Sequence, residues 1–309
     1  MRTSPVCAVA AALLCGALSA SRAAAQVPAD SLAQPPVRRN VFGGIERREA
    51  LPAAALFASN VAAQSVLTVG RGLAEGGRAG QVPAFALGGA AAGAGFYGAK
   101  RLVGARRPVA GFALAYASAS LAENVVAGGH ALSHVRLGLG PLDVRVATPF
   151  ARRADGGAGP GVSVEVEPLS LAAAVVLPLR GFRPRPCAAG VCYRGSEPER
   201  VVRGGRTFRR LGRTLGRVVR TWPPFSPRTD AHEGVHVVQG MQIEAATPAG
   251  TLRAALGARS GAPVALDVRT DWLLPLAGAA ISLVRYERAW TEREAFTLAG
   301  SDTEPVPPR

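Results

Sequence analysis

The H-E-G-V-H segment at positions 232–236 constrains the fold of this chain more than any other segment does. Residues four apart on an α-helix lie on one face, so the imidazoles of His232 and His236 can reach one metal ion if the segment is helical. Glu233 lies one step round that helix and can hold a water molecule beside the ion. Only four histidines occur in the 309 residues, and two of them fall in this motif. We therefore expect a buried helix over about 230–245 that presents both rings to a zinc ion.

Residues 230–239 resemble the H-E-x-x-H-V-V-Q signature of the peptidase-like domain found in extracellular contractile injection systems. The later E-R-E-A-F segment at 292–296 is similar to the E-x-x-A-D segment of gluzincins, whose third zinc ligand is a glutamate on a separate helix. The resemblance implies that a zinc ion is bound by three residues, with Glu233 as the catalytic base and a peptide or protein as substrate. These ligands would be His232, His236 and Glu292.

Other residues of the acidic segment are alternatives at this site. Glu294 is the second choice of ligand and Glu287 the third, and an oxyanion donor is expected from Tyr286, Arg285 or Arg288. Two departures from the family pattern favour another function, an inactive envelope or membrane-associated scaffold on a degenerate peptidase fold. Phe296 replaces the aspartate that commonly orients a ligating histidine. Gly234 weakens the motif helix by about 1 kcal/mol relative to alanine.

The first 25 residues are typical of a secretory signal peptide. Arg2 precedes an uncharged apolar stretch over 6–18, and three alanines stand before Gln26. A lipoprotein signal ending at Cys15 is an alternative interpretation. We expect export to the periplasm or cell envelope of a bacterium, followed by a flexible leader over 26–48.

The cysteines and charges agree with an exported protein. Beyond the predicted signal only Cys187 and Cys192 remain, and in an oxidising compartment they are expected to form a disulfide. The net charge is +15, and Lys100 is the single lysine beside many arginines. This usage is typical of codon bias in a high-GC genome. We expect contact of the arginine-rich region over 183–220 with an anionic membrane or envelope polymer, and no nucleic-acid partner.

The region over 49–136 is rich in alanine and glycine and predicts helices. Its uncharged stretches cover 51–70, 81–99 and 108–122. Each has the length of a helix, and the first two approach the length of a membrane span. Asn60, Gln64 and the glycines favour buried helices of a soluble core, with a membrane-embedded protein as the alternative.

From residue 137 the pattern changes to alternation, which predicts strands. We expect a β meander over 137–180, including a buried strand at 169–179. Residues 207–220 fit either a basic amphipathic helix or a strand over 215–221 beside the metal helix. Further along, Asp230 is expected to cap that helix. Two helices over 272–284 and 285–299 and a loose tail over 301–309 complete the chain.

Together these patterns predict an α+β fold that is zincin-like, with helices around a small, partly antiparallel sheet and a cleft between the sheet edge and the metal helix. The helical region over 49–136 precedes this zincin-like domain over 137–300. A second histidine pair, His130 and His134, has the same spacing, with Glu123 earlier on roughly the same face. Gly128-Gly129 interrupts a helix there, so a metal role is the less favoured interpretation.

Overall fold

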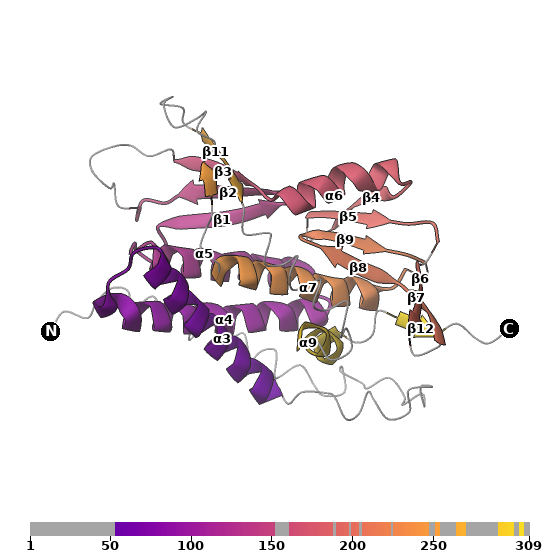
Figure 1. The fold of residues 1–309 in the computed structure, drawn as a ribbon, viewed down its shortest axis with the longest axis horizontal. Coiled ribbons are helices and arrows are strands. Elements are labelled where there is room, and N and C mark those ends of the chain that lie inside the picture. The colour runs from indigo at the N-terminus through magenta and orange to yellow at the C-terminus, as the bar shows by residue number, and fades with distance from the viewer. Residues whose placement is uncertain are drawn as a thin grey trace.

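The computed structural model describes residues 53–151, 161–187, 190–197, 199–203, 206–223, 225–246, 251–253, 264–269, 290–299 and 303–305. Over this part of the chain the fold is α+β, as the sequence predicts, with the long helices packed together on one side and small sheets on the other (Figure 1). The predicted signal peptide, the leader and the predicted helix over 272–284 lie outside the described residues.

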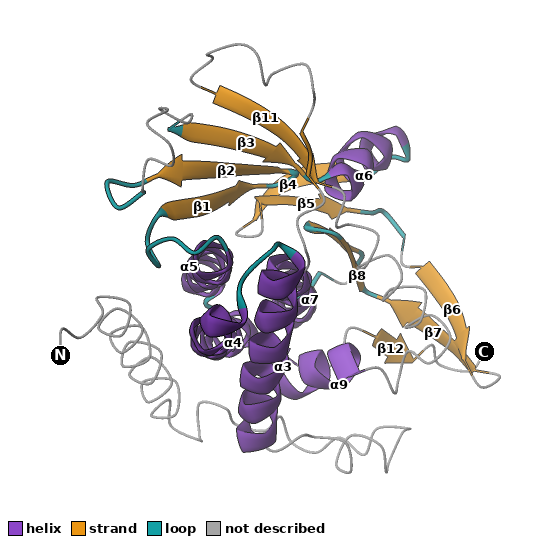
Figure 2. Ribbon diagram, turned by 60° about the vertical axis from the view of Figure 1, so that its left-hand side comes forward, coloured by secondary structure: helices purple, strands orange, loops and turns teal. Residues whose placement is uncertain are grey.

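The three predicted N-terminal helices are confirmed as α3 (Ala53–Ala74), α4 (Val82–Gly104) and α5 (Pro108–Val126). α4 packs between α3 and α5, and its glycines set the distance to α3 (Figure 2). A Cβ atom on Gly89 would lie 2.7 Å from the carbonyl oxygen of Gln64, and one on Gly93 would lie 2.5 Å from that of Asn60. Among the described helices, α3 and α5 are long and apolar enough to cross a membrane by length and composition alone.

The predicted motif helix is α7 (Pro227–Ala246), which packs against α4 and α5. Its Val235, Val238 and Met241 are buried in the main hydrophobic core. The prediction that Asp230 caps this helix is wrong. Ser226 is the cap, because its hydroxyl accepts a hydrogen bond of 3.1 Å from the Thr229 amide, and a proline follows it at the first helical position.

The strands of the described residues form three sheets. The first has the strand order β1-β2-β3-β11-β10, and its first three strands form the predicted antiparallel meander. The second has the order β4-β5-β9-β8, with β9 parallel to β5, and the third is the antiparallel set β12-β7-β6. The strands are β1 (His134–Leu139), β2 (Leu142–Ala147), β3 (Val162–Val166), β4 (Arg183–Cys187), β5 (Gly190–Arg194), β6 (Glu199–Arg203), β7 (Arg206–Arg210), β8 (Gly212–Leu215), β9 (Val218–Thr221), β10 (Thr251–Arg253), β11 (Val264–Arg269) and β12 (Thr303–Pro305).

Three predicted segments differ from the structure. The run over 169–179 is not a strand but the helix α6 (Pro168–Leu179), whose first amides bond to the Glu167 carboxylate. Residues 207–220 are not a helix: they fall in β7, β8 and β9, in agreement with the alternative of a strand beside the motif helix. In the predicted loose tail, residues 303–305 pair with β7 as β12.

A buried network of ion pairs joins the first sheet to the helices. Arg136 on β1 pairs with Asp143 on β2 and with Glu123 on α5. Arg217, in the turn between β8 and β9, pairs with Asp143 and with Glu244 on α7. Each of these five side chains is at most 5% exposed, so the network fixes how sheets and helices meet.

Candidate metal centre

α7 brings the two motif histidines together as the sequence predicts. The Nε2 atoms of His232 and His236 lie 3.1 Å apart. Two nitrogens bound to one tetrahedral zinc ion at about 2.0–2.1 Å would be separated by about 3.3 Å, so the pair fits such an ion. His232 is fully buried and His236 is partly exposed. These two donors therefore match the geometry of a zinc site without rearrangement of the helix.

Gln239 fixes the tautomer of His236. Its Nε2 lies 2.8 Å from a carboxylate oxygen of Glu294, which can only accept, so the amide nitrogen of Gln239 must face Glu294. The Oε1 atom of Gln239 then faces Nδ1 of His236 at 2.7 Å. That Nδ1 atom must donate the hydrogen bond. The lone pair of a neutral His236 consequently lies on Nε2, the atom that faces His232.

A buried polar cluster supports Gln239 from behind. The Lys100 ammonium lies 2.8 Å from Glu294 and 2.7 Å from oxygens of both Asn60 and Gln242, and Asn60 also donates to Glu294 at 2.7 Å. Burial alone raises the pKa of Glu294. The charge of Lys100 and the hydrogen bonds from Lys100, Gln239 and Asn60 outweigh this effect, so the pKa of Glu294 is lowered and the carboxylate stays ionised.

The edge strand β8 holds the predicted catalytic base. The Thr214 hydroxyl donates to the Glu233 carboxylate at 2.6 Å and to the Glu233 carbonyl oxygen at 3.1 Å. A Cβ atom on Gly212 would lie only 2.5 Å from the other carboxylate oxygen. Glu233 is 1% exposed. Its carboxylate is thus confined by one hydroxyl and by a glycine that leaves just enough room for it.

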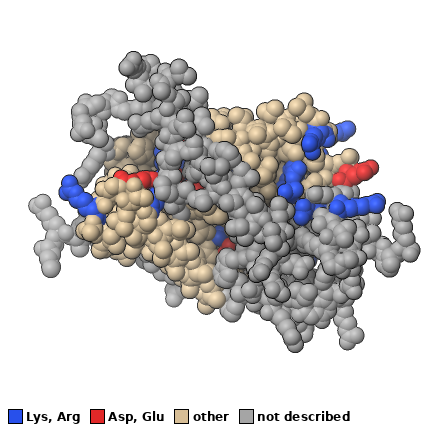
Figure 3. Space-filling model, in the orientation of Figure 1, with Lys and Arg blue, Asp and Glu red and all other residues tan. Residues whose placement is uncertain are grey.

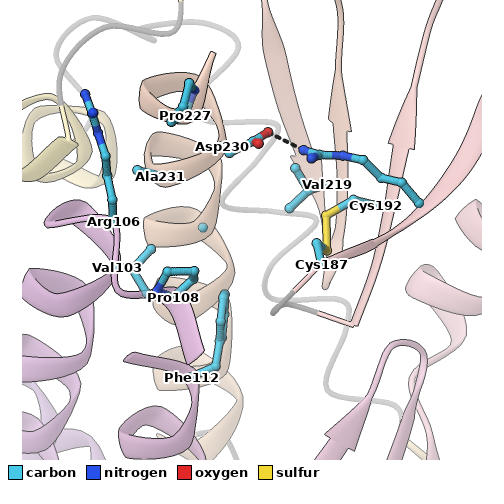
Figure 4. A pocket seen from close by; sticks show the side chains of 12 residues that line it. Val103, Arg106, Pro108, Phe112, Cys187, Cys192, Val219, Pro227, Asp230 and Ala231 are labelled. Atoms are coloured by element: carbon cyan, nitrogen blue, oxygen red, sulfur yellow. Dashed lines mark hydrogen bonds and ion pairs between the residues drawn. A yellow bond between two sulfur atoms is a disulfide. The ribbon is translucent and has the colours of Figure 1, made fainter. Parts of the chain in front are cut away.

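Gly234 has a packing role that its helix propensity does not suggest. A Cβ atom there would lie 2.7 Å from a methyl group of Val103, so the glycine allows α7 to approach α4. A cavity of about 270 Å³ lies on this side of α7 (Figure 4). Asp230, paired with Arg185, stands beside it. Neither motif histidine is among the residues that line this cavity.

The Cys187–Cys192 disulfide borders the same cavity. The bond is present as predicted, with the two Cα atoms 5.8 Å apart, and it closes the hairpin of β4 and β5. β9 lies beside β5, and β8 beside β9, so the disulfide braces the sheet whose edge carries Thr214. The disulfide therefore stabilises the four-stranded sheet that lies beside α7.

Several predicted site residues lie outside the described part. The backbone of Glu292 belongs to α9 (Trp290–Ala299), but its side chain is not among the described ones. The other predicted residues, Arg285, Tyr286, Glu287 and Arg288, lie outside the described residues altogether. Among the described residues no group of three histidine, cysteine or acidic side chains could hold a metal ion. Glu294, the alternative ligand, lies behind Gln239, where its oxygens accept from Lys100, Gln239 and Asn60.

The second histidine pair does not share a helix. His130 lies in a turn and stacks on Phe150, with 4.8 Å between ring centroids, whereas His134 begins β1. Glu123 accepts hydrogen bonds from Arg136 and Arg145.

Sequence reasoning missed the residues that support the histidines. Gln239 was visible in the motif, but its partners Lys100 and Asn60 come from helices far away in the chain. One signal was available: a chain that uses arginine almost everywhere keeps a single lysine, and that lysine is buried in this cluster. Comparison with protein-family models, curated proteins and solved structures gave no match to this chain.

Proposed function

We propose that this protein is an exported, zinc-dependent metallopeptidase of the zincin type, with His232, His236 and Glu292 as ligands. The observation that carries the proposal is the convergence of two Nε2 atoms 3.1 Å apart, next to a carboxylate held by a neighbouring edge strand. Two imidazoles and a carboxylate are the donor set of many catalytic zinc sites. The orientation of His236 by Gln239 supports the same assignment because it places the lone pair of the neutral ring on Nε2, the atom that faces His232.

Each residue has a defined part in this mechanism. Zinc, when bound, would lower the pKa of its water towards neutrality and polarise the scissile carbonyl group. Glu233 accepts a proton from the attacking water and returns it to the leaving amine. Thr214 holds one oxygen of Glu233 and so positions the carboxylate for this proton transfer. Gln239 keeps His236 in the ligating tautomer throughout.

A second function, a metal-bound scaffold without hydrolytic activity, is favoured by one specific observation. His232 and Glu233 are almost completely buried, at 0% and 1% exposure. A peptide must reach the base and the metal-bound water for hydrolysis. A site closed in this way would bind zinc for stability alone.

The first test is the metal content of the purified chain. We expect about one zinc ion per chain in the wild type, with loss of that zinc in His236→Ala and in Glu292→Ala. Glu287→Ala is the matched control, since it removes another glutamate of the same acidic segment. Wild-type protein that holds no zinc even after incubation with zinc salt would contradict the proposal. Loss of zinc in Glu287→Ala but not in Glu292→Ala would assign the third ligand to Glu287 instead.

Hydrolysis of a labelled protein substrate then separates the two functions. A peptidase should lose about two to four orders of magnitude in rate on Glu233→Gln while it keeps its zinc. If the zinc-loaded wild type and Glu233→Gln are equally inactive on unfolded and folded substrates, the scaffold function replaces the peptidase.

A further inference from the structure

The outward surface of α3 is apolar along the whole helix. Eleven of its residues are exposed, and all of them are alanine, glycine, valine or leucine. Val66 is 70% exposed, and Leu87 of α4, at 61%, continues the same layer. In Figure 3 the surface over α3, at lower left, is tan, with charged atoms at its edges. A helix that faces water normally shows polar residues there.

The inward side of α3 is the polar side. Its buried residues include Asn60, Gln64, Thr68 and Arg71, with Leu56 and Gly72. Asn60 donates to Glu294, and the Arg71 guanidinium donates to the carbonyl oxygen of Ala245 at 2.8 Å. This inverted polarity is unfavourable in water and favourable in lipid, where polar groups find partners inside the protein and apolar groups face the acyl chains.

The contact between α3 and α4 is also built like a contact between membrane helices. Gly89 and Gly93 have the G-x-x-x-G spacing and bring the α4 backbone against that of α3. The Ser65 hydroxyl donates across the interface to the carbonyl oxygen of Ala86 at 2.9 Å. Small residues and a hydroxyl hydrogen bond thus add to the aromatic contact of Phe57 on α3 with Tyr97 on α4, and such small-residue contacts are typical of membrane helices.

The rest of the fold limits how lipid can be reached. α7 packs against α4 and α5, and β1 packs against α5, so the far side of the helical layer is covered by protein. Sheet edges cannot enter hydrocarbon because their backbone groups would lose hydrogen bonds. Exposed Arg78 lies before α4, and Arg106 and Arg107 lie after it, so cations flank the apolar surface at both ends.

We propose that the α3 surface, defined by Ala62, Ala63, Val66, Leu67, Leu73 and Leu87, inserts into one leaflet of a lipid bilayer. The arginines at both ends of α4 then meet anionic headgroups, and the sheets stay outside the membrane. The α3 surface is separate from the histidines of α7, so this inference does not depend on the proposed peptidase activity.

The test is flotation of the full chain with vesicles. Phosphatidylcholine vesicles at about 0.5 M salt suppress binding through the arginines and isolate the apolar contact. We expect the wild type to float and Val66→Asp to lose about tenfold or more of the bound fraction, because aspartate is costly among acyl chains. Leu179→Asp on α6 is the matched control, since Leu179 is 82% exposed but lies away from α3. Added phosphatidylglycerol should increase binding at low salt.

Three results would overturn the proposal. Val66→Asp could float as well as the wild type, or Leu179→Asp could lose binding to the same extent as Val66→Asp. The wild type could also fail to float and sediment as a dimer that Val66→Asp separates, which would make the α3 surface an interface between copies. Thermal unfolding of both variants checks that they are folded, as expected for changes at exposed positions.

Discussion

At the residue scale, the proposed metal centre depends on Gln239, a side chain that would not itself bind the metal. Neutral His236 can carry its proton on either ring nitrogen, and a metal ion shared with His232 through Nε2 needs the form with the proton on Nδ1. Gln239 selects that form because Glu294 fixes the orientation of its amide. In the proposed site, the hydrogen bonds from Glu294 through Gln239 to His236 would take the place of the aspartate of the resembling family, where this chain has Phe296. They would also explain why a buried lysine–glutamate pair lies behind the site.

Gln239→Leu tests this role. The change removes the acceptor of the His236 Nδ1 proton, so we expect the affinity for zinc to fall about 10- to 100-fold, as for other outer-shell partners. Competition with a chelating dye measures the affinity. Gln242→Leu is the control, because Gln242 accepts from Lys100 in the same cluster without contacting His236 in the described contacts. Equal zinc affinity of Gln239→Leu and the wild type would remove Gln239 from the site.

Gly212→Ala probes the confinement of Glu233. The added methyl group would lie 2.5 Å from a carboxylate oxygen and 2.8 Å from the Thr229 methyl group, so the carboxylate must move. We expect the hydrolytic rate to fall about 100-fold, because a small misplacement of a catalytic group has effects of this size, while zinc content is unchanged. Gly240→Ala on α7 is the control, since open space surrounds that position. Unchanged activity of Gly212→Ala would mean that Glu233 is not the base.

At the element scale, the start of α7 depends on Ser226 rather than on Asp230. Ser226→Ala removes the acceptor of the Thr229 amide, and we expect a loss of about 1 kcal/mol in the free energy of unfolding. Asp230→Asn weakens a half-exposed ion pair with Arg185, which contributes about 0.2–1 kcal/mol. Urea denaturation of both variants measures the difference. A larger loss for Asp230→Asn would restore Asp230 as the residue that stabilises this end.

The same scale shows which elements a sequence pattern can predict. Long uncharged stretches that end before Arg71, Lys100 and Glu123 predicted α3, α4 and α5, and alternation predicted β1 to β3. The run over 169–179 has no usable period, so only Pro168 and the capping Glu167 distinguish a helix from a strand. Residues 207–220 have apolar side chains at helical spacing, yet Gly212 is the first residue of β8 and Gly216, with its positive φ, lies in the turn that follows β8.

At the scale of the whole molecule, the site is assembled from the two ends of the chain. The bond from Asn60 to Glu294 spans 234 residues, and that from Lys100 to Glu294 spans 194. No local pattern contains such pairings, so the histidines could be predicted and their support could not. The N-terminal helices are therefore part of the framework that supports Gln239 and the two histidines.

The buried ion pairs at Glu123 should make the whole fold sensitive to acid. Burial alone would raise the pKa of Glu123, but Arg145 and Arg136 outweigh it and lower the pKa to about 2, from 4.5. The ionised carboxylate therefore stabilises the fold above pH 4.5, and this contribution is lost as the pH falls towards 2. The shift corresponds to roughly 3 kcal/mol.

Urea denaturation between pH 7 and pH 2.5 tests this expectation with Glu123→Gln. The free energy of unfolding of the variant should be lower than that of the wild type by about 3 kcal/mol at pH 7, because the buried Arg136 and the partly exposed Arg145 lose a charged partner. The difference should shrink as the pH falls below 4.5, since the wild-type carboxyl then becomes neutral as well. Asp230→Asn, which removes a half-exposed charge, should show little such convergence. A difference between wild type and Glu123→Gln that stays constant down to pH 2.5 would show that packing, not charge, joins α5 to the first sheet.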